Sequence, residues 1–459
     1  MAAEGATMCG IAGIFGHDEA STLVLAALRA QQTRGTSAAG LAAWTGDRFT
    51  VETGLGMVDH VFPDMHEGRP YRAKSAIGHV RYPTSGGAGL ECAQPFQVGN
   101  VALCSNGDLP WYDNVRAILE EEGCKFRTRN DGELLAVMLQ HGLRSVRHTY
   151  AALGTVMMNQ QGAYSVVALM GDFGIAFRDP WGFRPLVLGK LRQGWVVASE
   201  TEALTQIGAR FERQVNPGEA LIFNPHDGEV VSRQIVEPEQ RAFCFFELVY
   251  FAFPSTKIFG EEVAAVRRRI GAQLYEEETM AFGDNTIVMS VPDSGNLYAD
   301  GYAEASGLHR VQGFVRRHHK GRTFILSGGR RAAVDAKFAF FESVLKGAKV
   351  ILCDDSIVRG STSQRLIGRL RQLGVREIHL RVGSPPITHS CHFGIDTPTQ
   401  EELLAARFNS NIPAMTKELG VNSLRYVSLD GLRSCLTRPG DHCYGCVTGD
   451  YPIPLPESH

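Results

Sequence analysis

Long apolar runs are missing from this sequence: no uninterrupted stretch approaches the roughly 18 to 20 residues that a membrane-spanning helix needs. An excess of one charge is missing too, because 46 Lys and Arg face 49 Asp and Glu and the net charge is −3. This balance gives no support to a nucleic-acid-binding protein or a membrane-surface protein. Ten cysteines in 459 residues are too few for a disulfide scaffold, and residues 1–8 have neither the basic patch nor the apolar core of a secretory signal. We therefore expect a cytoplasmic protein in which clustered cysteines serve a metal or catalysis.

The length of 459 residues predicts two large domains, with three possible, and 44% hydrophobic with 21% charged residues is ordinary globular composition. Neither internal repeats nor low-complexity tracts interrupt the chain. In the first half, short apolar runs bounded by Gly, Asn and Asp predict buried strands, for example at residues 10–15 and 101–104. Helices are predicted at residues 23–32 and 132–141, and a turn-rich stretch at residues 225–239 is the candidate linker.

Strands and helices alternate in the second half, which predicts a parallel, doubly wound sheet. The predicted strands cover residues 285–291, 349–353 and 377–382, and the predicted helices cover residues 298–306 and 361–373. Ligands of such sheets bind beyond the carboxyl ends of the strands. Two polar loops fall there, Pro292-Asp293-Ser294-Gly295 and Asp354-Asp355-Ser356.

Cys9 directly precedes a glycine-initiated apolar strand. A lone cysteine in such a place is most often a small buried hydrophobic residue. If residues 1–8 are absent from the mature chain, however, Cys9 becomes the N-terminal residue and its free α-amine can serve as the base for its own thiol. Either translation starts at Met8 and the methionine is trimmed, or a short propeptide is removed later; both routes stay open.

The motifs that follow Cys9 make its setting more specific. Read alone, Arg81 fits a surface salt bridge, Asp131 a helix cap and Asn106-Gly107 a turn. As an ordered series, however, the motifs resemble a class II glutamine amidotransferase domain with the αββα sandwich of N-terminal nucleophile enzymes. The series is Cys9-Gly10-Ile11-Ala12-Gly13-Ile14, Arg34-Gly35, Gly78-His79-Val80-Arg81-Tyr82, Gln94-Pro95-Phe96, Asn106-Gly107, Asn130-Asp131, Gly162-Ala163-Tyr164-Ser165, Arg178-Asp179-Pro180 and Arg184-Pro185-Leu186.

This resemblance implies a role for each residue. Cys9 would attack the glutamine carboxamide, and Asn106 and Gly107 would form the oxyanion hole. Glutamine would be bound by Arg34, by Arg81 on its α-carboxylate and by Asp131 on its α-ammonium. The run Gln32-Thr33-Arg34-Gly35-Thr36-Ser37 departs from the usual family pattern around Arg34.

The most informative string of the second half runs from Val350 to Thr362. Four apolar residues predict a buried strand, the two carboxylates after it can bind ribose hydroxyls and Mg²⁺, and the small residues beyond open a helix whose free N–H groups suit a phosphate. An acidic strand end beside a capped helix is the plain alternative. The string resembles the 5-phosphoribosyl-1-pyrophosphate (PRPP) motif of type I phosphoribosyltransferases. That resemblance implies Mg²⁺ on Asp354, Asp355 and Ser294, a pyrophosphate loop at Asp293, Ser294 and Gly295, and a 5-phosphate cradle at Arg359, Gly360, Ser361, Thr362 and Ser363.

Together the two halves, from Cys9 to about residue 452, resemble the glutamine phosphoribosylpyrophosphate amidotransferase family. The family's reaction opens purine synthesis: ammonia released from glutamine passes through a closed channel to C1 of PRPP and displaces pyrophosphate. The resemblance also implies a homotetramer and purine nucleotides as inhibitors. Expected boundaries are residues 1–8 as a propeptide or a wrongly assigned start, 9–239 as the amidotransferase domain and 240–459 as the phosphoribosyltransferase domain with a cysteine-bearing end.

Several positions of the second half depart from the family pattern, namely residues 253–256, the loop at residues 316–323, Asp335 and Glu342. Arg330 and Arg331 are candidates for restoring the lost positive charge. Two further hypotheses therefore stay open: a divergent paralogue that aminates another phosphoribosyl-like acceptor in specialised metabolism, and a regulatory protein without turnover.

A CxxC pair, Cys443 and Cys446, lies near the C-terminus and by itself fits a zinc half-site, a redox pair or chance. With Cys244 and Cys391 it completes a four-cysteine set that resembles the [4Fe–4S] ligands of one branch of the family. Zinc and four unligated thiols are the alternatives. The other cysteines are predicted to be packing residues: Cys92, Cys104, Cys124, Cys353 and Cys435.

Overall fold

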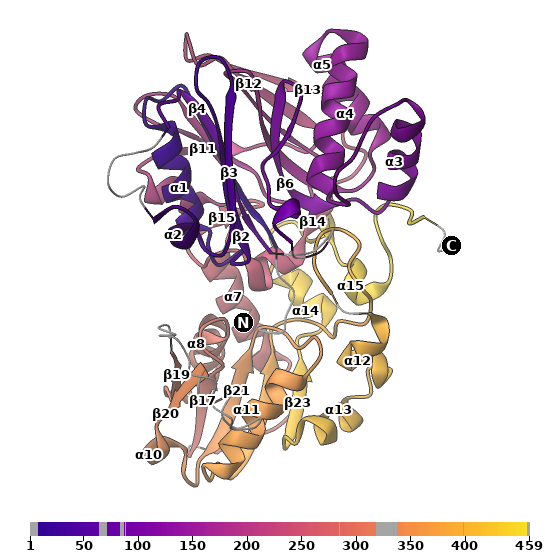
Figure 1. The fold of residues 1–459 in the computed structure, drawn as a ribbon. Helices are drawn as coiled ribbons and strands as arrows, with labels where there is room; N and C mark the ends of the chain where they lie inside the picture. Colours follow the sequence, from indigo (N-terminus) through magenta and orange to yellow (C-terminus); the bar gives the residue numbers. More distant parts are fainter. Residues whose placement is uncertain are drawn as a thin grey trace.

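The computed structural model describes residues 8–63, 71–82, 87, 89–283, 285–317, 334, 337–397 and 399–456. The chain forms an upper part that contains its first half and a lower part that contains most of its second half, with β14, α7, α14 and α15 where the two meet (Figure 1). Residues 1–7, 318–323, Arg330, Arg331 and Asp335, about which the sequence raised expectations, lie outside the described residues.

Two antiparallel sheets face each other in the upper part. The first has the order β11-β9-β10-β1-β4-β2-β3 and the second the order β13-β12-β8-β7-β6-β5. Side chains alternate between the faces of a strand, so Ile11 of the central strand β1 packs between the sheets while Ala12 and Ile14 face the helices. The strands are β1 (Gly10–Phe15), β2 (Ala38–Trp44), β3 (Phe49–Leu55), β4 (Ser75–Arg81), β5 (Phe96–Val98), β6 (Val101–Asp108), β7 (Ala163–Met170), β8 (Phe173–Arg178), β9 (Val187–Lys190), β10 (Trp195–Ala198), β11 (Arg210–Gln214), β12 (Glu219–Phe223) and β13 (Val230–Gln234).

Helices cover the outer face of each sheet, which completes an αββα sandwich (Figure 1). Over the first sheet lie α1 (Ala20–Ala30), α2 (Val58–Val61) and α6 (Thr201–Gln206). Over the second lie α3 (Tyr112–Glu121), α4 (Asp131–Val146) and α5 (Thr149–Asn159). The turn η2 (Leu90–Cys92) precedes β5.

The segment after the sandwich crosses between the two parts. Its first strand, β14 (Phe243–Cys244), pairs in parallel with the distant β24 (His442–Cys443), so the chain's C-terminal region returns to this junction. The other elements here are η3 (Glu247–Phe251), β15 (Lys257–Ile258), β16 (Glu261–Glu262), α7 (Val263–Glu276), α14 (Leu429–Ser434), η5 (Pro439–Asp441) and α15 (Gly445–Thr448).

A five-stranded parallel sheet with the order β18-β17-β21-β22-β23 forms the lower part. Its strands are β17 (Thr286–Ser290), β18 (His309–Arg310), β21 (Lys349–Asp354), β22 (Glu377–Val382) and β23 (Ser423–Tyr426). Alternate residues of β21 pack on opposite sides, Ile351 with the cluster that includes α7 and α8 (Asn296–Ser306), and Leu352 with α11 (Ser361–Gln372) and α13 (Ile412–Leu419). The remaining elements are β19 (Phe314–Arg316), β20 (Phe338–Phe340), α10 (Glu342–Leu345), η4 (Gln400–Glu402) and α12 (Leu404–Arg407).

The predicted fold class is confirmed, a sandwich of two antiparallel sheets followed by a parallel sheet with helices on both faces. The predicted linker at residues 225–239 is wrong in part, because Val230–Gln234 is the edge strand β13 and pairs with β12. Its five residues are mostly exposed, so the period-two pattern of a half-buried strand is absent there.

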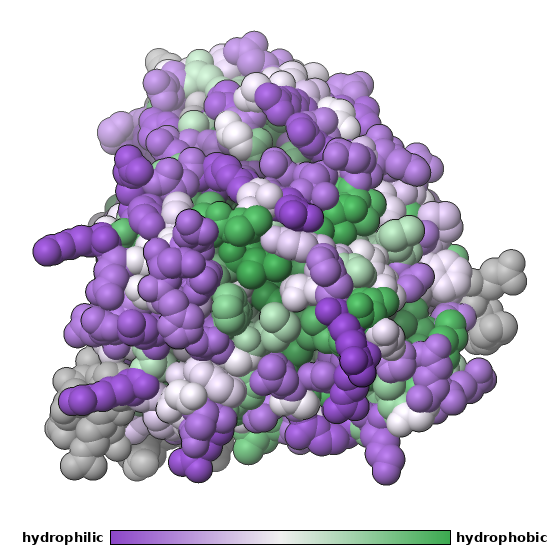
Figure 2. All heavy atoms as spheres, turned by 90° about the horizontal axis from the view of Figure 1, so that it is seen from above, coloured by the Kyte–Doolittle hydropathy of each residue, from purple (hydrophilic) through white to green (hydrophobic). Residues whose placement is uncertain are grey.

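Seen from above, the end formed by the sandwich is mostly hydrophilic, with apolar residues in patches (Figure 2). Exposed large apolar residues of the sandwich include Met158, Phe211 and Val231. Among the described residues, no helix is both long and apolar enough to span a membrane.

Candidate active site

Cys9 lies at the start of β1, which runs between β10 and β4 in the middle of the first sheet. Its side chain is 9% exposed, and the thiol donates to the carbonyl oxygen of Tyr82 at 3.6 Å. Burial raises the pKa of this thiol, and the nearby charges of Arg81 and Arg34 oppose that effect only in part. Met8 is fully buried before it. The Cys9 thiol is therefore protonated at neutral pH, and the backbone nitrogen of Cys9 belongs to the peptide bond with Met8.

Arg34 lies directly behind the nucleophile. Its Nε donates to the carbonyl oxygen of Cys9 at 2.9 Å. Its two terminal nitrogens are held by buried carboxylates: Nη1 by Glu200 at 2.5 Å, and both by Glu247 at 3.0 and 2.8 Å. Since the whole guanidinium is engaged in this way, Arg34 supports the backbone of Cys9, which differs from the direct glutamine contact that the sequence suggested.

Asn106 and Gly107 lie side by side in β6. The Asn106 side chain is buried, and its amide nitrogen Nδ2 has no hydrogen-bond partner among the described residues. Burying a hydrogen-bond donor without a partner costs free energy, so such a donor indicates a place where a ligand can supply the acceptor. Gly107 has no room for a side chain, because a Cβ there would lie 1.8 Å from the carbonyl oxygen of Ala163. These two residues have the form of a donor pair for a developing oxyanion.

Gln94 joins the segment of Asn106 to that of Asp131. Its Oε1 accepts from the backbone nitrogen of Ser105 at 2.6 Å, and its Nε2 donates to Asn130 Oδ1 at 3.2 Å. Asn130 is the N-cap of α4, since its Oδ1 also accepts from the nitrogen of Gly132 at 2.9 Å. Asp131 is thus not the helix cap. The side chain of Gln94 links the start of α4, where Asp131 lies, to the strand that contains Asn106 and Gly107.

Asp131 shares a hydrogen bond with Asp108, a residue that the sequence did not suggest. Burial raises the pKa of Asp108, and the hydrogen bond with Asp131 opposes this shift. Both carboxyl groups line a cavity of about 630 Å³ that also contains Tyr112, Thr128 and Arg129. The negative charge of this pair suits an ammonium group, while Arg116, Arg127 and Arg129 line the same cavity.

Arg81 ends β4 and is buried. Its Nη2 donates to the carbonyl oxygen of Gly87 at 2.5 Å and its Nη1 to that of Gly89 at 3.4 Å. Its charge also reaches Cys9, because it lowers the pKa of that thiol. Two residues before it, His79 is fully buried, and burial lowers its pKa to about 3. The imidazole beside Arg81 is therefore neutral at pH 7.

The second candidate site lies at the carboxyl ends of β17 and β21, which are neighbours in the parallel sheet. Asp354 ends β21 and Asp355 follows it. Ser294, from the loop after β17, forms a hydrogen bond with Asp355, so the two predicted loops do meet. Gly295 permits this approach, because a Cβ there would lie 2.4 Å from the carbonyl oxygen of Cys353.

Burial raises the pKa of Asp354 well above its usual range, and the charge of Asp355 adds to the shift. Burial raises the pKa of Asp355 as well, against hydrogen bonds from Ser294 and Ser356, whose Oγ lies 2.6 Å from Asp355 Oδ2. Two buried carboxyl groups side by side need a cation or a shared proton. Oxygen ligands of this kind suit Mg²⁺, which commonly uses one or two protein carboxylates and completes its shell with waters and substrate phosphates.

Other groups around this acidic pair were not suggested by the sequence. Tyr250 of η3 lies close to the pair. Burial raises the pKa of Tyr250, and the charges of Asp355 and Asp354 raise it further. Arg316, at the end of β19, lies 3.9 Å from Asp293 in the loop after β17. The predicted pyrophosphate loop therefore has a guanidinium beside it.

The N-terminus of α11 follows the acidic pair. Gly360 is its N-cap with φ +81°, no side chain caps the first turn, and a Cβ on Gly360 would lie 3.1 Å from Leu404. The first-turn N–H groups at Ser361, Thr362 and Ser363 therefore suit an anion. Arg359 donates from Nη2 to Glu402 at 3.3 Å, while its buried Nε has no hydrogen-bond partner among the described residues.

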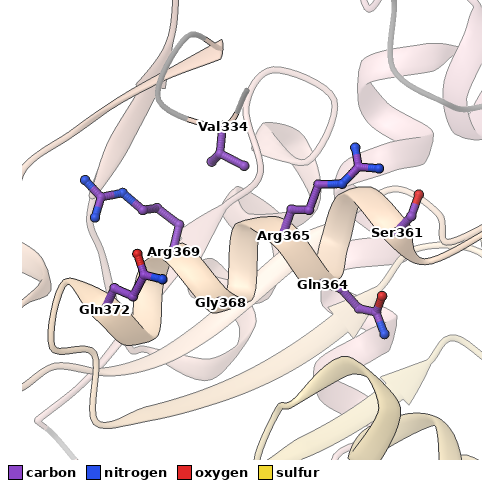
Figure 3. Close-up of a pocket in the computed structure, with 7 residues that line it drawn as sticks. All are labelled: Val334, Ser361, Gln364, Arg365, Gly368, Arg369 and Gln372. Carbon is purple, nitrogen blue, oxygen red and sulfur yellow. The ribbon is translucent and has the colours of Figure 1, made fainter. Parts of the chain in front are cut away.

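A cavity of about 510 Å³ runs along α11 from this end (Figure 3). Arg365 and Arg369 rise from the helix on the side that faces Val334, and Ser361 lies at the N-terminal end. The positive charge of the two arginines extends the field of the helix N-terminus. The other lining residues are Gln364, Gly368 and Gln372.

The four cysteines of the predicted cluster come together at the junction of the two parts. Cys244 and Cys443 are register partners of β14 and β24. Burial raises the pKa of the Cys446 thiol well above its usual range, and the charges of Cys391, Cys244 and Cys443 raise it further. All four are free of disulfide bonds.

Four cysteine thiols are the donor type that an iron–sulfur cluster uses. In the described part of the chain, no group of three or more His, Cys, Asp or Glu side chains is placed to hold a metal ion. The four thiols, two of them buried (Cys244, Cys446) and two half-buried (Cys391, Cys443), lie in mutual electrostatic reach with the guanidinium of Arg184 nearby, a setting that suits an anionic cluster.

The fold and the two sites define an enzyme in which an N-terminal nucleophile amidotransferase is fused to a type I phosphoribosyltransferase. Residues 89–206 match the family model described as "Glutamine amidotransferase domain". Full-length relatives identify the combination: the chain belongs to the amidophosphoribosyltransferase family.

Amidophosphoribosyltransferase of Archaeoglobus fulgidus is 38% identical over 98% of this chain and 99% of its own length. Amidophosphoribosyltransferase of Bacillus subtilis is 36% identical over 97% of this chain and 94% of its own. Two solved structures match as well. Glutamine PRPP amidotransferase from B. subtilis, complexed with ADP and GMP, has a TM-score of 0.88 at 34% identity, with 98% of each chain covered. A structure described as the allosteric regulatory enzyme of purine biosynthesis has a TM-score of 0.90 at 36% identity, covering 98% of this chain and 97% of the other. None of these relatives supports a different acceptor.

Proposed function

We propose that this chain releases ammonia from glutamine at Cys9 and transfers it to C1 of PRPP, the first step of purine synthesis. Products would be 5-phosphoribosylamine, glutamate and pyrophosphate. The observation that carries the proposal is the pairing of two sites in one chain: an unpartnered buried amide donor in the same half as Cys9, and a buried acidic pair at the end of a parallel sheet. Both lie in a chain that matches amidophosphoribosyltransferases over nearly its whole length.

At the first site, removal of Met8 would turn the nitrogen of Cys9 into an amine that takes the proton of the thiol. The sulfur would then attack the carboxamide carbon of glutamine, and Asn106 Nδ2 and the Gly107 N–H would stabilise the oxyanion. The C–N bond breaks, ammonia leaves with the transferred proton, and water hydrolyses the thioester to glutamate. Arg81 would bind the α-carboxylate and Asp131, with Asp108, the α-ammonium.

At the second site, Asp354 and Asp355 would bind the ribose hydroxyls and, with Ser294, Mg²⁺. The ion would neutralise charge on the pyrophosphate as it leaves. Asp293, Ser294 and Gly295 would surround the pyrophosphate, and the first turn of α11 would hold the 5-phosphate. Arg359 would complete this cradle, because its Nη2 donates to Glu402 while its buried Nε has no partner among the described residues.

Ammonia needs a dry route between the sites, because in water at pH 7 it becomes ammonium and loses its nucleophilicity. One continuous apolar cluster supports such a route: it contains residues beside Cys9, such as Met8 and Val80, and residues of the parallel sheet, such as Ile351. Segment η3 lies between, with Glu247 on Arg34 and Tyr250 beside the acidic pair.

Several further features belong to this proposal. The division into residues 9–239 and 240–459 agrees with the strands, since β13 ends at residue 234 and β14 begins at residue 243. Cys244, Cys391, Cys443 and Cys446 would hold a structural [4Fe–4S] cluster, as the reaction has no redox step. Purine nucleotides are the proposed inhibitors, by analogy with the ADP and GMP of the B. subtilis structure. A homotetramer stays a prediction.

Two variants test the division of labour. Cys9→Ala should abolish glutamine-dependent pyrophosphate release from PRPP and keep the ammonia-dependent reaction, whereas Asp354→Asn should abolish both and keep some glutamine hydrolysis. If Cys9→Ala also removed the ammonia-dependent reaction, the two-site assignment would fail. Wild-type protein that hydrolyses glutamine but releases no pyrophosphate at millimolar PRPP would contradict PRPP as the acceptor.

A further inference from the structure

The loop after Cys391 reaches from the phosphoribosyltransferase half into the candidate glutaminase site. Gly394 is packed so closely on the oxyanion residue that a Cβ there would lie 2.9 Å from the carbonyl carbon and 3.0 Å from the Cα of Gly107. This contact joins positions 287 residues apart in sequence (394 − 107). Interiors pack densely and have little room to give, so the position of Gly394 constrains that of Gly107.

Phe393 attaches the same loop to the amidotransferase half in two ways. Its ring stacks on Phe183, with centroids 4.4 Å apart. Its carbonyl oxygen accepts two hydrogen bonds from Arg184, one from Nε at 2.9 Å and one from Nη2. Arg184 is fully buried and also lies 3.6 Å from Glu247, the carboxylate that holds Arg34 behind Cys9.

His392 extends the loop toward the glutamine-binding end of the site. The His392 side chain lies within electrostatic reach of Asp108, which shares a hydrogen bond with Asp131. Phe393 and Gly394 therefore contact the arginine network behind the nucleophile and the oxyanion glycine, and His392 lies near the carboxylate pair.

We infer that residues 392–394 are a positioning wall of the glutaminase site, supplied by the other half of the chain, and that Gly394 sets the place of the Gly107 oxyanion donor. The inference rests on the proposed function of Cys9 and Gly107. It adds that the amidotransferase half is incomplete without this loop. Because Cys391 begins the loop, whatever holds that thiol in the four-cysteine set also holds the wall in place.

Gly394→Ala tests the inference, with Gly46→Ala as the matched control. Gly394 has φ +100° and Gly46 has φ +102°, but a Cβ on Gly46 meets nothing within 4 Å. Both variants place an alanine at nearly the same positive φ, and only Gly394→Ala also presses on Gly107 and on Arg184 Nη2, which would lie 3.1 Å away. Glutamine-dependent and ammonia-dependent amination, glutamine hydrolysis without PRPP, and the alkylation rate of Cys9 are measured for each.

Gly394→Ala should lower kcat with glutamine by on the order of 10²-fold, as the loss of an oxyanion donor does. The KM for glutamine, the alkylation rate of Cys9 and the ammonia-dependent rate should stay near those of Gly46→Ala, because neither the thiol nor the second site is touched. Equal glutamine-dependent rates in the two variants would overturn the inference.

Gly394→Ala could also lose the ammonia-dependent rate through misfolding. In that case Arg184→Lys tests the inference instead. It gives up the paired hydrogen bonds to Phe393, so selective loss of glutamine use supports the wall and unchanged glutamine use refutes it. A wild-type protein that fails to aminate PRPP would instead count against the proposed function, and hydrolysis of glutamine alone would still test the loop.

Discussion

The buried charges behind Cys9 allow a sharp prediction about Glu247→Gln. Glu247 faces Arg34 at 2.8 Å and Arg184 at 3.6 Å, and all three side chains are wholly inaccessible to water. With Glu200, which lies 2.5 Å from Arg34, the group contains two positive and two negative charges. Glutamine keeps the shape of Glu247 and removes one negative charge, which leaves two buried guanidinium groups with a single carboxylate.

Breaking a buried ion pair from one side costs about 3–5 kcal/mol, because the remaining charge is left uncompensated. We expect Glu247→Gln to lower the free energy of unfolding by that amount, measured by urea denaturation followed by near-ultraviolet circular dichroism. Arg34→Met should cost a similar amount, because it leaves Glu200 without an ion-pair partner and Glu247 with Arg184 alone. The double variant should cost less than the sum of the two, since contacting charges couple. Glutamine hydrolysis should fall too, because Arg34 Nε holds the carbonyl oxygen of Cys9.

The control is Glu120→Gln, which removes an ion pair of similar length from the surface of α3. Arg116 and Glu120 lie 2.8 Å apart, with the Glu120 side chain exposed and that of Arg116 half-buried, and such i,i+4 pairs contribute about 0.3–0.5 kcal/mol. If Glu247→Gln were no more costly than Glu120→Gln, or if the costs of Glu247→Gln and Arg34→Met simply added, the reasoning about the buried network would be refuted.

Three further predictions concern the thiols and the oxyanion donor. Burial raises the pKa of Cys9, so in a chain that retains Met8 the rate of alkylation by iodoacetamide should be low at pH 7 and rise only as the pH approaches the raised pKa. A chain that starts at Cys9 should react faster near neutral pH. Equal pH profiles of the two chains would contradict the role of the amine. Asn106→Ala should lower kcat for glutamine hydrolysis by about 10²–10³-fold with little change in KM, and a change confined to KM would remove it from the oxyanion hole. Anaerobically purified protein should be brown with a shoulder at roughly 400 nm that Cys443→Ser abolishes and Cys435→Ser keeps; a colourless wild type with stoichiometric zinc would refute the cluster.

The strand ends and loops were predictable because their signals are local. A four-residue apolar run followed by Asp354 and Asp355 defines a strand and its carboxyl end without knowledge of the rest of the chain. Parallel pairing then brings the loop of Ser294 to the same edge, as the structure shows. The exposed edge strand β13 has no such signal and was predicted as a linker.

The partners of Arg34 could not be predicted, because they are distant in the sequence. Its sequence context resembles a substrate-binding motif, but its carboxylates come from Glu200 and Glu247, 166 and 213 residues away. Nothing in a single sequence pairs charges over that distance. The same holds for Gly394, whose contact with Gly107 depends on how the two halves dock.

Segment η3 shows why that docking matters for both reactions. Glu247 at its start is fixed by buried charges beside Cys9, and Tyr250, three residues later, lies beside the acidic pair of the second site. Arg267 of α7 also holds the segment, because its Nε and Nη2 donate to the carbonyl oxygens of Leu248 and Ala252 at 3.0 and 2.8 Å. A shift of Glu247 would expose or unpair charges at a cost of several kcal/mol, which is far more than the thermal energy. Tyr250 is therefore anchored by the amidotransferase half, and any rearrangement around the acidic pair that displaces Tyr250 must work against the contacts that support the nucleophile.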